Sequence, residues 1–153
     1  MQQPISVYVI KHPRCKDGLE TARLIYSEIN RNIDDQTIIK SGIPVYFTDS
    51  DRDADNRLII NTADSDNVAV VILADSNMML SSETEWQSYL TSLYELAKNN
   101  ASVRLFPVAY RESVMKADLL QDSLGKLNFI RLYKLEIFGF KRYFLFKLVE
   151  YAF

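Results

Sequence analysis

Cysteine, histidine and glycine are scarce in this 153-residue chain, and each shortage excludes a class of protein. The single cysteine, Cys15, has no internal partner, which excludes a small secreted scaffold held together by disulfides. The single histidine, His12, excludes a histidine-rich metal cluster. The four glycines lie far apart, at positions 18, 42, 125 and 139, so the chain has neither a phosphate-binding P-loop nor a dinucleotide-binding fingerprint.

The chain also lacks a strong charge imbalance and a long apolar run. Eighteen Lys and Arg residues face 20 Asp and Glu residues, and a net charge of −2 offers no broad positive surface to DNA or RNA. No apolar run reaches the roughly 18 residues that a membrane span needs, and the opening residues 1–4 lack the basic and apolar regions of a signal peptide. We therefore expect a cytoplasmic protein that binds neither nucleic acid nor a membrane.

What the chain does contain is an alternation of strand-like and helix-like segments, within a composition of 48% hydrophobic and 25% charged residues that is ordinary for one folded domain. Runs of β-branched and aliphatic residues followed by helical spacing predict an α/β fold. The expected strands are residues 5–10, 43–47, 68–74, 103–109 and 128–133. The expected helices are residues 18–33, 83–98 and 114–124, with a short, weak helix beginning at residues 58–60.

Five parallel strands joined by right-handed crossovers predict a flavodoxin-like three-layer domain with strand order 2-1-3-4-5. In such a sheet, ligands bind beyond the carboxyl ends of strands one and three, where the winding direction reverses. This places a candidate crevice between residues 12–16 and the segment that follows the third strand. Residues 48–57 contain no large apolar side chain and are expected to form an exposed, flexible loop that makes one wall.

The last residues differ from the rest, because five of the eight Phe residues fall between positions 138 and 153. A helix in this region would be apolar on nearly all sides and would have to be buried. We expect residues 1–135 to form the α/β domain, and residues 136–153 to form an aromatic C-terminal helix that packs on it or leads to a further domain.

The carboxylate of Glu85 is the leading catalytic candidate, because it is expected at the start of the helix that follows the central strand. Glu85 also stands three positions after Ser82, the spacing of a capping box in which the glutamate only accepts the backbone N–H of Ser82. Both interpretations stay open. Cys15 is expected to be an inert small residue rather than a nucleophile. The acidic residues 49–55 lack the glycine and the final glutamate of a calcium loop, since Ala54 and Ile60 occupy those positions.

Several of these segments resemble the Toll/interleukin-1 receptor (TIR) domains of bacteria. The resemblance rests on the runs at residues 5–10, 43–47 and 70–76, on Ser81, Ser82 and Trp86, and on the apolar-Pro-apolar pattern at residues 105–108. It covers about residues 5–133. It implies a flavodoxin-like domain of an antiphage immune system, which either associates with itself or another TIR domain in signalling, or cleaves NAD+ at the bond between nicotinamide and ribose.

The resemblance also implies a site. Catalytic members of the family use a glutamate early in the third helix, commonly four residues after a tryptophan; that position is Leu90 here, which leaves Glu85 as the substitute. Arg14 is expected near the pyrophosphate, and Tyr46 or Phe47 beside a planar ring. NAD+ or a related nucleotide is then the substrate, and no cofactor or metal is implied. The full set of expected substrate-binding residues is His12, Arg14, Phe47, Asp75, Ser76 and Trp86.

Two other functions stay open. Leu90 at the usual position of the acid favours a non-catalytic TIR-like module that acts by self-association. A flavodoxin-like enzyme that processes nucleosides, similar to the deoxyribosyltransferases, also fits a glutamate placed beyond a central strand.

Overall fold

The protein is an α/β structure built on a parallel sheet, as the alternating sequence pattern predicts. The computed structural model describes residues 3–34, 43–80, 83–111, 113–114 and 130–131. The sheet holds β2 (Val45–Tyr46), β1 (Gln3–Lys11), β3 (Ser65–Ala74) and β4 (Val103–Ala109) in the order 2-1-3-4, and the two-residue β5 (Ile130–Arg131) pairs with β4. The parallel order of the first four strands confirms that part of the prediction.

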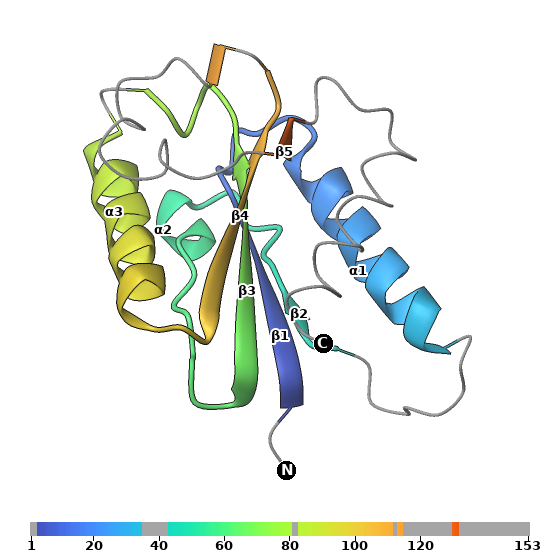
Figure 1. Cartoon of the computed structure of the whole chain (residues 1–153). Helices are drawn as coiled ribbons and strands as arrows, with labels where there is room; N and C mark the ends of the chain where they lie inside the picture. The colour runs from blue at the N-terminus through green and yellow to red at the C-terminus, as the bar shows by residue number, and fades with distance from the viewer. Residues whose placement is uncertain (1–2, 35–42, 81–82, 112, 115–129, 132–153) are drawn as a thin grey trace.

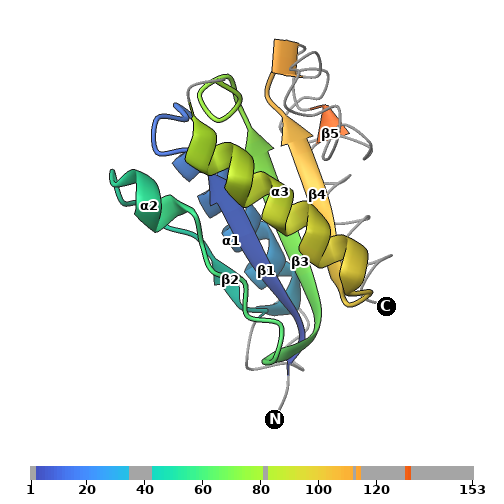
Figure 2. The same ribbon diagram turned by 90° about the vertical axis from the view of Figure 1, so that its left-hand side faces the viewer.

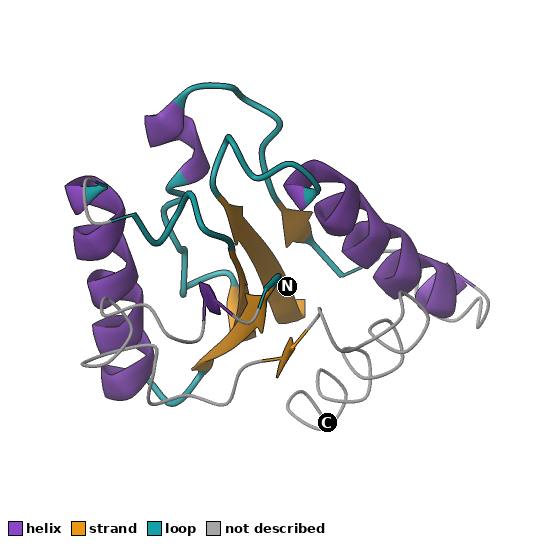
Figure 3. Ribbon diagram, turned by 90° about the horizontal axis from the view of Figure 1, so that it is seen from above, coloured by secondary structure: helices purple, strands orange, loops and turns teal. Residues whose placement is uncertain are grey.

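Helices cover both faces of the sheet (Figure 1). The helix α1 (Gly18–Asp34) lies on one face, and α3 (Thr84–Asn99) lies on the other together with the short α2 (Asp53–Asn56). The view along the sheet in Figure 3 shows α1 and α3 on opposite sides. This arrangement follows from right-handed crossovers, because the chain leaves β1 in one direction through α1 and leaves β3 in the opposite direction through α3.

Alternate residues of the two central strands form two separate cores. Tyr8 and Ile10 of β1 pack with Trp86 and Leu90 of α3, whereas Val7 and its odd-numbered neighbours pack with α1. Both faces of β3 are buried, which explains why its apolar run has no alternation.

The segment between β2 and β3 is where the prediction is wrong. The helix expected at residues 58–60 is absent, and α2 instead occupies residues 53–56, inside the segment predicted to be a flexible loop. Leu58 and Ile60 pack against the α3-side core without regular secondary structure, while Ile59 is exposed. The alternating burial of Leu58, Ile59 and Ile60 is typical of a strand. Because all three residues are apolar, the sequence shows no alternation that would predict it.

Several predicted elements lie wholly or partly outside the described residues. These are the helix at residues 114–124 beyond Val114, the fifth strand beyond residues 130–131, the tail at residues 136–153, and Ser81 and Ser82.

Candidate functional site

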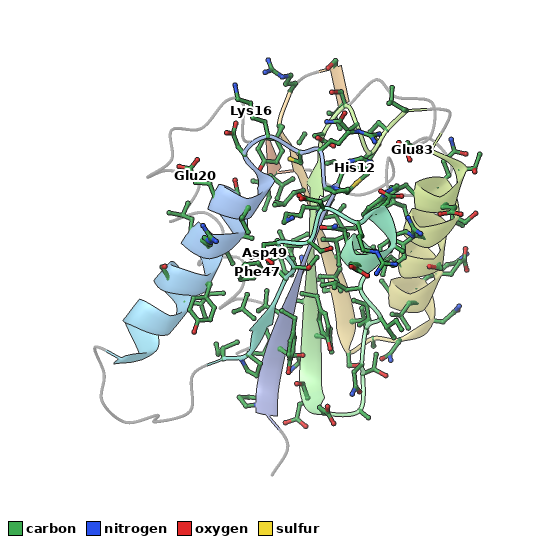
Figure 4. All side chains as sticks on the ribbon, turned by 180° about the vertical axis from the view of Figure 1, so that it is seen from behind. His12, Lys16, Glu20, Phe47, Asp49 and Glu83 are labelled. Carbon is green, nitrogen blue, oxygen red and sulfur yellow. The ribbon has the colours of Figure 1, made fainter. Side chains whose placement is uncertain are left out.

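A cluster of polar and charged side chains lies beyond the carboxyl ends of β1 and β3, on the side of the sheet that α3 covers. Figure 4 labels His12 and Glu83, the residues that follow β1 and precede α3. Asp53 joins them from the first turn of α2, which lies next to α3 in Figure 2. One donor or acceptor atom from each of His12, Asp53 and Glu83 lies within 4.8 Å of the other two.

His12 is the buried centre of this cluster. Its side chain is 0% exposed, and its ring lies 5.4 Å from that of Trp86. The backbone N–H of Arg14 donates to Nδ1 at 3.1 Å, so Nδ1 is an acceptor and the proton of the neutral ring sits on Nε2. Nε2 lies 3.6 Å from both Asp53 Oδ1 and Glu83 Oε1, beyond hydrogen-bond range, and has no hydrogen-bond partner among the described residues.

Asp53 is held by two donors, one from α3 and one from the residue that follows α2. The indole N–H of Trp86 donates to Oδ1 at 2.8 Å, and Nη1 of Arg57 donates to Oδ2 at 2.7 Å. Burial by itself raises the pKa of this carboxyl group, but the hydrogen bonds from Trp86 and Arg57 outweigh it and hold the pKa below its usual value. Asp53 is therefore a carboxylate that Trp86 and Arg57 hold in a fixed position within the cluster.

Glu83 is shared between the buried histidine and an exposed arginine. Its side chain is 19% exposed, and Nη2 of Arg14 donates to Oε1 at 2.5 Å. The Arg14 side chain is 60% exposed, while its backbone carbonyl accepts a hydrogen bond from Nδ2 of Asn77 in the loop after β3. Arg14 thus connects the loop after β1 with the loop after β3, the two loops expected to form the crevice. Its side chain is bonded to the carboxylate of Glu83.

A metal ion does not suit the chemistry of this cluster, although its three residue types are common ligands. A ligating Nε2 needs a free electron pair, which would put the ring proton on Nδ1, where it would meet the N–H of Arg14. Arg14 and Arg57 also neutralise the two carboxylates. The cluster instead presents a neutral N–H between two anionic acceptors.

Glu85, the expected catalytic residue, is placed at the rim of the cluster. Its side chain is 73% exposed and accepts a hydrogen bond from Nη2 of Arg57 at 2.9 Å. The predicted N-cap at Ser82 is wrong, because α3 begins one residue later than expected, with Glu83 in the N-cap position and without a side-chain cap hydrogen bond. The guanidinium group of Arg57 also lies over the Trp86 ring, with its central carbon 5.7 Å from the ring centroid.

Four other predicted or considered residues lie away from this cluster. Phe47 packs toward α1, edge-on to Tyr26, and Tyr46 packs on the ring of Tyr8. Asp75 closes the turn after β3 by accepting from the Met78 N–H and from Asn77. Ser76 is exposed.

Cys15 is buried, and its surroundings suppress its reactivity. Burial and the neighbouring carboxylate of Asp75 raise the pKa of the thiol to about 12, since both oppose the thiolate. The expectation that this residue is inert agrees with that environment.

A buried amide fixes the segment that carries Asp53. Asn56 is 1% exposed, and its Nδ2 donates to the carbonyl oxygens of Ser50 and Arg52. Its Oδ1 accepts from Nζ of Lys11, a lysine that is only 5% exposed, at 3.2 Å. The predicted flexible loop is therefore tied to the end of β1.

The sequence reasoning did not identify Asp53, Asn56, Arg57 or Glu83 as residues of the site. One available signal was the spacing of Asp53 and Arg57, since an acid four residues before a base on a helix forms an ion pair.

Comparisons with known proteins find no match for this chain. No protein-family model matches the chain, and neither the curated proteins nor the solved structures contain a significant match. Within the described part of the chain, no helix combines the length and the apolar character needed to cross a membrane.

Proposed function

We propose that this chain is a TIR-like, flavodoxin-like domain that cleaves NAD+ at the bond between nicotinamide and ribose, with Glu83 as the carboxylate that acts on the sugar. The observation that carries the proposal is the cluster of His12, Asp53 and Glu83 at the carboxyl edge of β1 and β3. The parallel order 2-1-3-4 is compatible with a flavodoxin-like fold, whose ligands bind at this edge.

The chemistry requires one well-placed carboxylate. As the glycosidic bond breaks, nicotinamide leaves as a neutral base with the bonding electrons, and positive charge develops on the ribose. Water then adds to C1′ and loses a proton, which gives nicotinamide, ADP-ribose and H+. A half-desolvated carboxylate stabilises the developing charge more strongly than an exposed one, because the local dielectric constant is lower. On that ground Glu83, at 19% exposure, suits the role better than Glu85 at 73%.

Arg14 has a second role in this proposal. Its exposed guanidinium neutralises Glu83, and a pyrophosphate is a stronger bidentate partner for an arginine than a single carboxylate oxygen. Exchange of Arg14 from Glu83 to the substrate would free the carboxylate at the moment of binding. Activity would then depend on an anionic group next to the ribose.

The test is release of nicotinamide from NAD+ by purified protein at high concentration and deliberately clustered, followed by mass spectrometry. We expect Glu83→Gln to lower the rate by about 10²–10³-fold, as the loss of one preorganised charge does elsewhere. Glu95→Gln, an exposed position further along α3, is the matched control and should leave the rate unchanged. Circular dichroism should show equal folding of all variants.

Other outcomes separate the alternatives. No nicotinamide from the clustered wild type would refute the proposal and favour a non-catalytic module. A loss of activity in Glu85→Gln but not in Glu83→Gln would return the catalytic role to Glu85. Base exchange on a nucleoside, with NAD+ untouched, would favour an enzyme similar to the deoxyribosyltransferases.

A further inference from the structure

The buried N–H of His12 lacks a partner among the described residues, and an unpaired buried donor is costly. Such a group gives up its hydrogen bond to water on folding and gains none in return. Nε2 belongs to a fully buried ring, yet it lies 3.6 Å from each of two carboxylate oxygens, one from Asp53 and one from Glu83. The donor lies at the same distance from the two acceptors, and each distance is too long for a direct hydrogen bond.

The chemistry of the three groups limits what can join them. A cation would be repelled by the N–H and an anion by the two carboxylates. A group that fits must accept a hydrogen bond from Nε2–H and donate one to a carboxylate, and a hydroxyl does both. Two neighbouring hydroxyls fit better than one, because each can donate to its own carboxylate.

From this arrangement we infer that His12, Asp53 and Glu83 recognise a pair of adjacent hydroxyls on the substrate's sugar, so that the site selects ribose over 2′-deoxyribose. The inference rests on the proposed function for the identity of the sugar, and it adds His12 and Asp53 as residues that determine specificity. Asp53 suits this part because Trp86 and Arg57 hold its carboxylate in place before any ligand binds.

The arrangement also predicts the direction of selectivity. A site that is built to hydrogen-bond a hydroxyl rejects an analogue that lacks it, since its own polar groups are then left unpaired. The hydrogen bonds here involve charged acceptors and correspond to about 10–100-fold in affinity for each hydroxyl.

The experiment compares the binding of two probes by isothermal titration calorimetry, with nicotinamide release measured in parallel. The probes are NAD+ and its analogue with 2′-deoxyribose on the nicotinamide side, because both carry the pyrophosphate that would draw Arg14 away from Glu83. We expect the wild type to bind NAD+ at least about tenfold more tightly than the analogue. His12→Asn keeps an acceptor near the position of Nδ1 and removes the Nε2 donor, so selectivity should fall to nearly onefold. His12→Gln keeps a donor near Nε2 and should retain most of the selectivity.

Two further measurements keep the outcomes distinct. Asp53→Asn, at a partly exposed position, should lower selectivity without the risk of altering a buried ring, and Glu95→Gln is the control. Equal binding of both probes by the wild type, binding of neither at millimolar concentration, or unchanged selectivity in His12→Asn would overturn the inference. Selective binding without cleavage would refute the proposed reaction and leave the inference standing, and unselective cleavage would do the reverse.

Discussion

Replacing Asn56 by Ala tests whether a buried amide holds the segment that supplies Asp53. The change removes three hydrogen bonds, two to backbone carbonyls and one from the ammonium group of Lys11. Neutral bonds contribute about 1 kcal/mol each and a bond to a charged group about 1.5–3 kcal/mol, so we expect the free energy of unfolding to fall by about 3–5 kcal/mol. For a domain of this size the melting temperature should drop by on the order of 10 °C.

The assay is urea unfolding followed by far-UV circular dichroism, with the fluorescence of Trp86 as a second probe next to the site. Asn67→Ala is the matched control, because among the described residues the Asn67 side chain makes one long hydrogen bond, to the carbonyl of Pro4 at 3.4 Å, and the variant should lose less than about 0.5 kcal/mol of unfolding free energy. Lys11→Met in the Asn56→Ala background should recover about 1–2 kcal/mol, since it removes the amine that lost its acceptor. A loss no larger than that of the control would refute the reasoning.

Two further predictions concern the cysteine and the pH dependence of stability. With its pKa raised to about 12, Cys15 should react with iodoacetamide at pH 8 at least about tenfold more slowly than free cysteine, and rapidly once the chain is denatured; fast alkylation of the native protein, seen by mass spectrometry, would contradict this. The pKa of Asp53 is lower in the folded chain than its usual 3.8, so its charge stabilises the fold above about pH 4 and this contribution disappears as the pH falls through the folded value. The stability difference between wild type and Asp53→Asn should therefore shrink between pH 7 and pH 3 in urea unfolding, and a difference that grows would show that the carboxylate is not stabilised.

The sequence predicts the parts of the fold that depend on apolar periodicity. The run at residues 68–74 marks β3 as a strand buried on both faces, and the helical spacing of Trp86, Leu90 and Leu93 marks the buried face of α3. These patterns arise because a sheet and its covering helices must bury apolar surface. They also locate the two loops that meet at the carboxyl edge of the sheet.

The candidate site is less predictable, because polar side chains determine it. Lys11, His12 and Asn56 are buried although their residue types are usually exposed. Lys11 and Asn56 are hydrogen-bonded to each other across 45 positions of the chain, and the His12 ring lies against that of Trp86, contacts that no periodic pattern encodes. Glu83 replaces Glu85 as the preferred carboxylate because its side chain is 19% exposed and that of Glu85 is 73% exposed, a difference that the apolar periodicity does not predict.

The segment with α2 joins the end of β1 to the start of α3, and this linkage connects stability with the proposed specificity. On one side Asn56 is bound to Lys11, and on the other Asp53 is bound to the indole of Trp86. Lys11 and His12 are neighbours in sequence, and both lie next to this segment, Lys11 at Asn56 and His12 at Asp53. A hydroxyl bound between His12 and Asp53 depends on a spacing that Asn56 helps to set without touching the ligand. The selectivity of the site is thus a property of the whole segment rather than of its contact residues alone.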